Sequence, residues 1–266
     1  MIDTHCHLSH PDFEPDREAV ISRSWTQGVT AILEVGYSVL TSRFAVALAR
    51  QHPDRIRAAV GIHPHEAGTA GDADFAAVEA LLSEPEVIAI GETGLDFYRD
   101  WAPRDRQLAL FRRTVNLARE RGLPVVVHDR DAHEDVLGII EAEGRGEVRG
   151  IFHCFSGDAE VARRAMDLGF CLGLGGSITY MNPRKTRGQM LAELPLERLV
   201  LETDAPWLSP EPEKGARNEP ARMRHVVARL AELQGRDERD IVRATSENVS
   251  RLFAHAAPWP PREGRA

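Results

Sequence analysis

The stretch 1–10, MIDTHCHLSH, starts with apolar residues and ends with side chains that bind metal ions well. His5 and His7 are two residues apart, so on a strand both project from the same face, with Asp3 one step below them. Imidazole and carboxylate groups are ligands that suit Zn²⁺, Mn²⁺ or Fe²⁺. The stretch is therefore predicted to be a short strand that presents metal ligands at its carboxyl end.

Short apolar segments of this kind recur along the chain, with longer segments of helical periodicity between them. Near-continuous apolar strands that alternate with helices indicate a parallel sheet covered by helices. Eight units in about 200–250 residues fit a (β/α)8 TIM barrel, and a doubly wound open sheet is the alternative that periodicity does not exclude. The eight segments are MIDTHCHL, VTAILEVG, RIRAAVGIHPH, VIAIGETGLD, LPVVVHDRD, RGIFHCFSG, GFCLGLGGSI and RLVLETDAP.

Two of the intervening segments carry clear helix-end signals. Residues 107–122 have apolar positions at helical spacing and end on Gly122, a residue typical of helix C-termini. Residues 158–169 begin with Asp158, an N-cap candidate, and end on Gly169. We find no repeat and no linker, and we expect a single metal-dependent hydrolase domain over residues 1–255 with a flexible C-terminal tail over residues 256–266.

The composition limits the class of protein. The 266 residues carry a formal net charge of −8, which is not the profile of a protein that holds nucleic acid by bulk electrostatics. Bound divalent cations would change the sign of a local site, so nucleic acid is not excluded as a substrate. Three widely spaced cysteines favour a reducing compartment, and no apolar run approaches the roughly 18 residues of a membrane span. We expect a cytoplasmic monomer.

Polar side chains gather at the ends of the predicted strands. In a parallel barrel these carboxyl ends meet on one face, which is where barrel enzymes have their active sites. Six such groups exceed the needs of one tetrahedral ion, so two ions that share a carboxylate are predicted, with Glu92 as the bridge because it lies between the two histidine sets. The six candidate metal ligands are His5, His7, Glu92, His128, His153 and Asp204.

At this point the sequence resembles the TatD-related metal-dependent deoxyribonucleases, a branch of the amidohydrolase-like barrels. The resemblance runs from residue 2 to about residue 253 and implies a TIM barrel with two or three divalent ions, Zn²⁺, Mn²⁺ or Mg²⁺. It also implies hydrolysis of phosphodiester bonds by a metal-activated water, often 3′→5′ on single-stranded DNA, with RNA left open. The motifs that carry it are DTHCHL, GIHPHEA, IGETGLDFYR, VVHDRDA, HCFSG, GGSITY and LETDAPWLSP.

Carried over residue by residue, the resemblance implies the same six ligands and adds His63 as a phosphate-contacting histidine. Asp204, Glu92 and His63 are thus the expected catalytic residues, with Asp204 as the group that accepts a proton from water. Glu202 becomes a neighbour of the site. Asp129 departs from the family pattern, which has a small residue there; it could add a ligand, orient His128 or do nothing.

Substrate contacts are expected from loops that follow the site strands. Tyr98 and Trp207 could stack on bases, and Arg99 could meet phosphates. Ser156 stands at a predicted helix start whose free amides could take a phosphate, although an ordinary capped helix explains the same residues equally well. The expected substrate-binding residues are His63, Ser156, Arg99, Tyr98 and Trp207.

Three rival functions share parts of this pattern. A small-molecule amidohydrolase would cleave amides, lactones or aminoacyl esters, but its carboxylated-lysine subtype does not fit, because the first lysine of the chain is Lys185. A phosphoesterase acting on small phosphate esters would use the same metals. A non-catalytic barrel that binds a partner would be expected to have lost ligands, and this sequence has all six.

Overall fold

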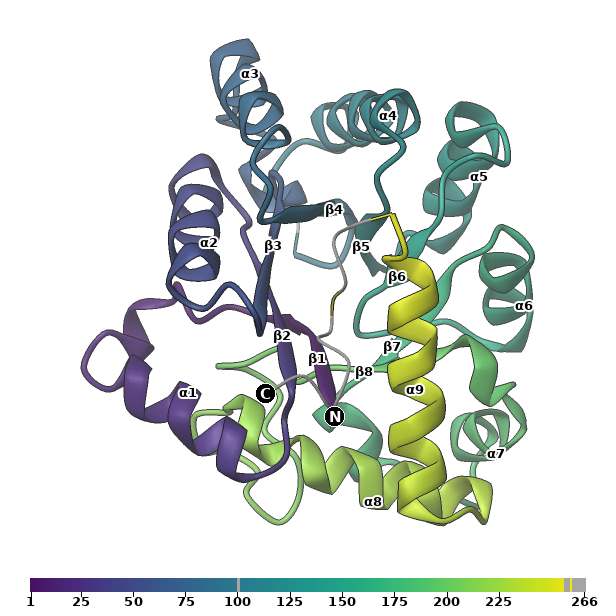
Figure 1. The fold of residues 1–266 in the computed structure, drawn as a ribbon. Helices are drawn as coiled ribbons and strands as arrows, with labels where there is room; N and C mark the ends of the chain where they lie inside the picture. Colours follow the sequence, from purple (N-terminus) through teal and green to yellow (C-terminus); the bar gives the residue numbers. More distant parts are fainter. Residues whose placement is uncertain (100, 256–258, 260–266) are drawn as a thin grey trace.

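The computed structural model describes residues 1–99, 101–255 and 259 and contains eight parallel strands whose order in space is their order along the chain. Helices α1 to α8 surround the strands (Figure 1). The predicted (β/α)8 barrel is confirmed. The strands are β1 (Ile2–Cys6), β2 (Ala31–Val35), β3 (Ile56–Val60), β4 (Val87–Asp96), β5 (Val125–Arg130), β6 (Gly150–Phe152), β7 (Cys171–Leu174) and β8 (Leu199–Leu201).

The helices follow the strands in the alternation that the periodicity predicts. Gly122 ends α4 in the left-handed conformation with a φ of 63°, and the side chain of Asp158 accepts two backbone N–H groups of α6, so these two predicted helix ends are confirmed. The helix α6 ends at Asp167 with Leu168 as its C-cap, and Gly169, with a φ of 87°, follows directly. The helices are α1 (Arg17–Thr26), α2 (Val39–Gln51), α3 (Asp72–Leu81), α4 (Arg104–Arg121), α5 (His133–Gly144), α6 (Ala159–Asp167), α7 (Thr186–Glu193), α8 (Met223–Gln234) and α9 (Glu238–Leu252).

The barrel closes between β1 and the segment that follows β8. The N–H of Asp204 donates to the carbonyl of His5 at 2.9 Å, and the N–H of His7 donates to the carbonyl of Ala205 at 2.8 Å. The buried carboxylate of Asp3 accepts the hydroxyl of Thr203 at 2.6 Å. This join places the first and last candidate ligands side by side at the carboxyl end of the strands.

Two apolar clusters hold the barrel together. The larger lies between strands and helices and contains Phe111, Phe152 and Phe170, all buried. The smaller consists of strand residues such as Leu33, the end of α9 and Trp259. Close packing of these layers fixes the strand ends, where the candidate ligands lie.

Trp259 lies at the end of the barrel opposite the candidate site. Its indole is buried, and Nε1 donates to the carbonyl of Arg55, just before β3 begins. The other residues of the expected tail, 256–258 and 260–266, lie outside the described residues, so the domain boundary at residue 255 stays a prediction. None of the described helices is long and apolar enough to cross a membrane.

Replacing Gly94 of β4 by alanine is expected to destabilise the barrel by about 3 kcal/mol. Gly94 has a φ of 141°, and an added Cβ would lie 1.9 Å from the backbone oxygen of His128 on β5. Gly138 of α5 has nothing within 4 Å of such a Cβ and is the matched control, where alanine should stabilise by about 0.5–1 kcal/mol. Urea unfolding measures both; equal midpoints would contradict the expectation.

Candidate active site

The carboxylate of Glu92 lies at the centre of the candidate site, buried between two groups of histidines. Glu92 belongs to β4, and its Oε2 is 3.5 Å from Nε2 of both His5 and His7 at the end of β1. Asp204, after β8, approaches the same two histidines, with Oδ1 3.8 Å from Nε2 of His5 and 3.6 Å from Nε2 of His7. One oxygen of Glu92 therefore belongs to a His5–His7–Asp204 group.

The other oxygen of Glu92 faces a second group of histidines. Its Oε1 is 2.9 Å from Nδ1 of His128 on β5 and 3.4 Å from Nε2 of His153 after β6. His63, after β3, also brings Nε2 to 3.4 Å from this oxygen. The structure thus brings together all six candidate ligands and His63, with the bridging candidate between the two sets.

The orientation of His5 and His7 fits a bound cation. Nδ1 of His7 lies 2.7 Å from the carbonyl oxygen of Val35, which can only accept, so the proton of the neutral ring sits on Nδ1 and Nε2 carries a lone pair. That lone pair points at Nε2 of His5, only 3.0 Å away. A cation between the two nitrogens and the nearby carboxylates satisfies all of these groups at once.

The charges of the cluster are strongly coupled. Burial would raise the pKa of Glu92, but the surrounding imidazoles hold it well below its usual range. Burial would lower the pKa of His153, yet the charges of Glu202 and Glu92 raise it to about 10. Glu92 is therefore ionised at neutral pH and attracts positive charge into a buried site.

His63 is held as a hydrogen-bond donor. The backbone N–H of His65 donates to Nδ1 of His63 at 3.1 Å, so this nitrogen is unprotonated and the proton sits on Nε2. Burial lowers the pKa of His63 to about 4, so the ring is neutral at pH 7. A neutral ring with Nε2–H directed into the site suits donation to a phosphoryl oxygen better than metal coordination.

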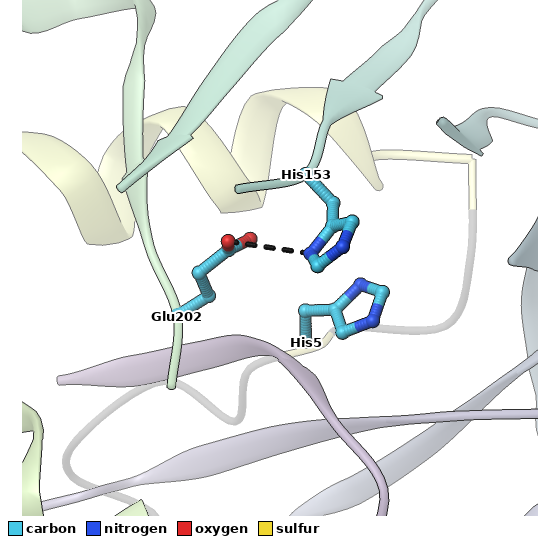
Figure 2. A group of neighbouring side chains, drawn as sticks. All are labelled: His5, His153 and Glu202. Carbon is cyan, nitrogen blue, oxygen red and sulfur yellow. Dashed lines mark ion pairs between the residues drawn. The ribbon is translucent and has the colours of Figure 1, made fainter. Parts of the chain in front are cut away.

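Glu202 lies beneath the cluster, where it faces two of the histidines (Figure 2). Its Oε1 is 3.3 Å from Nδ1 of His153, and a ligand atom of His5 lies within 4.8 Å of both. The rings of His5 and His153 stack with centroids 3.7 Å apart. Glu202 is fully buried. As a neighbour of the site, it places a carboxylate behind the two candidate ligands His5 and His153.

Two further buried carboxylates position the site, and sequence reasoning assigned a role to neither. Asp96, at the end of β4, approaches Nε2 of His128 at 3.2 Å and Nε2 of His65 at 2.8 Å. Glu34, within β2, accepts the backbone N–H groups of Leu8 and Ser9 at 2.8 Å each. The signal that could have found them is an acidic residue inside an apolar strand, which burial tolerates only when it is paired.

Asp129 points away from the cluster. Its Oδ2 lies 2.7 Å from Nδ1 of His133 at the start of α5, and within the described residues its side chain makes no hydrogen bond or ion pair with His128. Among the three roles considered for Asp129, this geometry favours neither an additional ligand nor an orienting partner of His128. The departure from the family pattern instead links β5 to α5.

The candidate substrate residues lie around the mouth of the site. Trp207 is 44% exposed, and its ring is 5.2 Å from that of His7, whereas Tyr98 is 58% exposed on the loop after β4 with Arg99 beside it. Ser156 is exposed, but Asp158 already takes the free amides of α6, as an ordinary capped helix requires. The substrate roles of these residues stay predictions.

Adding Zn²⁺ or Mn²⁺ to metal-stripped protein is expected to raise its melting temperature. A cation at one hundred times its Kd stabilises the folded state by about 3 kcal/mol. Glu92→Gln should remove most of this increase, because both histidine groups lose their shared charge. The control is Glu213→Gln, which removes a carboxylate paired with His225 at 3.3 Å outside the site. An unchanged increase in Glu92→Gln would contradict the central role of Glu92.

Glu202→Gln is expected to weaken metal binding by about 10- to 100-fold, because an amide supports the two histidines less well than a carboxylate. Competition with a chelating dye measures the affinity, and thermal unfolding of the stripped protein checks that the variant folds. A metal affinity equal to that of the unchanged protein would show that Glu202 does not act on the ligands.

Comparison with known proteins places this site in a family. Residues 2–254 match the family described as TatD related DNase. A metal-dependent hydrolase of Bacillus subtilis, YabD, whose function is uncharacterized, is 41% identical over 95% of this chain and 98% of its own. The Erwinia tasmaniensis protein named 3′-5′ ssDNA/RNA exonuclease TatD is 36% identical over 95% of this chain and 99% of its own.

A solved structure agrees with these relatives. The crystal structure of YJJV, a TatD homologue from Escherichia coli, superposes with a TM-score of 0.89 at 33% identity and covers 96% of this chain and 98% of its own. The barrel, the histidine–carboxylate cluster and the match over nearly the whole length agree. The chain therefore belongs to the TatD related DNase family and is a metal-dependent hydrolase.

Proposed function

We propose that this chain is a deoxyribonuclease that removes nucleotides from the 3′ end of single-stranded DNA, with RNA as a second substrate to be tested. The observation that carries the proposal is the carboxylate of Glu92, whose two oxygens face two separate groups of ligands. Two ions about 3.5–4 Å apart are a common solution to phosphodiester hydrolysis. Among relatives, the Erwinia protein carries an exonuclease name, whereas YabD is uncharacterized.

The two groups define the proposed metal sites. His5, His7 and Asp204 would hold one ion, and His128 and His153 the other, with Glu92 shared between them. Four imidazoles among six ligands suit Zn²⁺ or Mn²⁺ better than Mg²⁺, which prefers oxygen ligands. When bound, the ions would lower the pKa of a water molecule and offset charge on the phosphoryl group.

The protein side chains supply proton transfer and orientation. The Asp204 carboxylate is ionised: burial would raise the pKa of Asp204, but the surrounding histidines together hold it below its usual range. Its side chain is 13% exposed, against 5% for Glu92, so it is the cluster carboxylate best placed to accept a proton from water. Nε2–H of His63 would donate to a phosphoryl oxygen at the opposite side of Glu92.

The experiment is hydrolysis of end-labelled single-stranded DNA by metal-stripped protein with Mn²⁺, Mg²⁺ or Zn²⁺ added back. We expect a ladder from the 3′ end that depends on the added metal. Glu92→Ala should abolish the ladder, and Asp204→Asn should lower kcat by about 10²- to 10⁴-fold, as expected for loss of a proton acceptor. Glu213→Ala, outside the site, should leave the rate unchanged.

Metal binding without cleavage of DNA or RNA would refute the nuclease proposal while leaving the metal site intact. Small phosphate esters, amides and aminoacyl esters are then the substrates to test with the same variants. A ladder that persists in Glu92→Ala would instead show that the activity belongs to a contaminant or to another site.

A further inference from the structure

An exposed group of aromatic and cationic side chains borders the candidate active site at the ends of β4 and β5. Trp101 is 64% exposed and Tyr98 58% exposed. The guanidinium of Arg99 lies 5.2 Å from the ring centroid of Trp101, and that of Arg130 lies 4.2 Å from that of Tyr98. We call these four residues, Tyr98, Arg99, Trp101 and Arg130, the rim platform.

The rim platform is connected to the site through a series of tilted and edge-to-face ring contacts. The ring of Trp101 is 4.5 Å from that of His65, and the ring of His65 is 4.2 Å from that of His63. His63 in turn faces Glu92. Two ring contacts therefore link the indole of Trp101 to His63, which faces the candidate metal ligand Glu92. This separation suits a nucleotide next to the one at the candidate metal site.

The rim platform is held in place from below by the carboxylate of Asp96. Its Oδ1 accepts the backbone N–H groups of Tyr98 and Arg99 at 3.0 and 2.9 Å, and its Oδ2 lies 2.8 Å from Nε2 of His65. The same Oδ2 also approaches His128. One buried group thus links the backbone of Tyr98 and Arg99 to His65 and to a candidate metal ligand, His128.

The guanidinium groups of the rim platform have no carboxylate partner within residues 1–99, 101–255 and 259. Arg99 and Arg130 contact aromatic rings alone. Many arginines elsewhere face acidic side chains, which is expected in a chain with a net charge of −8. Examples are the pairs Arg23 with Glu219, Arg50 with Glu84, and Arg113 with Asp72.

We propose that the rim platform binds a nucleotide adjacent to the scissile phosphate, with its base stacked on Trp101 and its phosphate facing Arg99 and Arg130. This proposal rests on the proposed nuclease function and extends it to two residues that the sequence analysis gave no role, Trp101 and Arg130. An indole face accepts any unpaired base but not a base inside a duplex, so the rim platform selects single strands without reading their sequence.

The first test compares two substrates. Trp101→Ala should raise KM for a single-stranded oligonucleotide by about tenfold, while kcat/KM for bis(p-nitrophenyl) phosphate, a diester without bases, stays within about twofold. Trp101→Phe should restore most of the oligonucleotide KM. Failure of the unchanged protein to cleave any oligonucleotide would refute the proposed function; cleavage with the same KM in Trp101→Ala would refute the rim platform alone.

The second test locates the nucleotide. A single abasic residue is moved along the oligonucleotide. At one position it should raise KM for the unchanged protein, and at that same position it should leave KM for Trp101→Ala unchanged. Additive effects of the abasic residue and Trp101→Ala at every position would show that the indole does not stack on a base.

The third test concerns the arginines. Arg99→Ala and Arg130→Ala should each flatten the dependence of log KM on log salt by about 0.7, the contribution of one phosphate contact on a single strand. Arg55→Ala is the matched control, since its guanidinium lies 5.1 Å from the ring of Trp25 at the opposite end of the barrel. Equal slopes in all three variants would overturn the phosphate assignment.

Discussion

The burial of one carboxylate among imidazoles is the constraint on which this structure depends. Glu92 is nearly inaccessible to solvent and lies within 3.5 Å of nitrogens from five histidines. A buried charge of this kind is costly unless it is matched, and imidazoles match it only when they carry protons or share a cation. The cluster is therefore built to hold positive charge, and the parallel barrel provides the rigid ring of strand ends that keeps its members in place.

Support for the cluster comes from a layer of further carboxylates. Asp96, Glu34 and Glu202 each contact a candidate ligand or the loop that carries one, and all three are buried. None of them is placed to meet substrate directly. Asp96 and Glu202 approach imidazole nitrogens of candidate ligands and so fix ring orientation, whereas Glu34 fixes the backbone that follows His7.

The sequence allowed the barrel and the gathering of the six candidate ligands to be predicted, because strand polarity and the alternation of side chains determine both. It did not reveal where the side chain of Asp129 points. Near the end of a strand the side-chain orientation depends on local partners, and the partner of Asp129 is His133. The tautomer of His63 was equally out of reach, because it depends on a backbone N–H two residues later. Trp101 was overlooked because its contact with His65 joins two loops that periodicity does not relate.

The join between the first strand and the segment after the last has a consequence for synthesis of the protein. Asp3 and Thr203, which form it, are 200 residues apart, so the group of His5, His7 and Asp204 cannot assemble until almost the entire barrel has emerged from the ribosome. The histidines at the ends of β5 and β6 come from the middle of the chain. The complete cluster of histidines and carboxylates therefore exists only after the segment that follows β8 has been made and has joined β1.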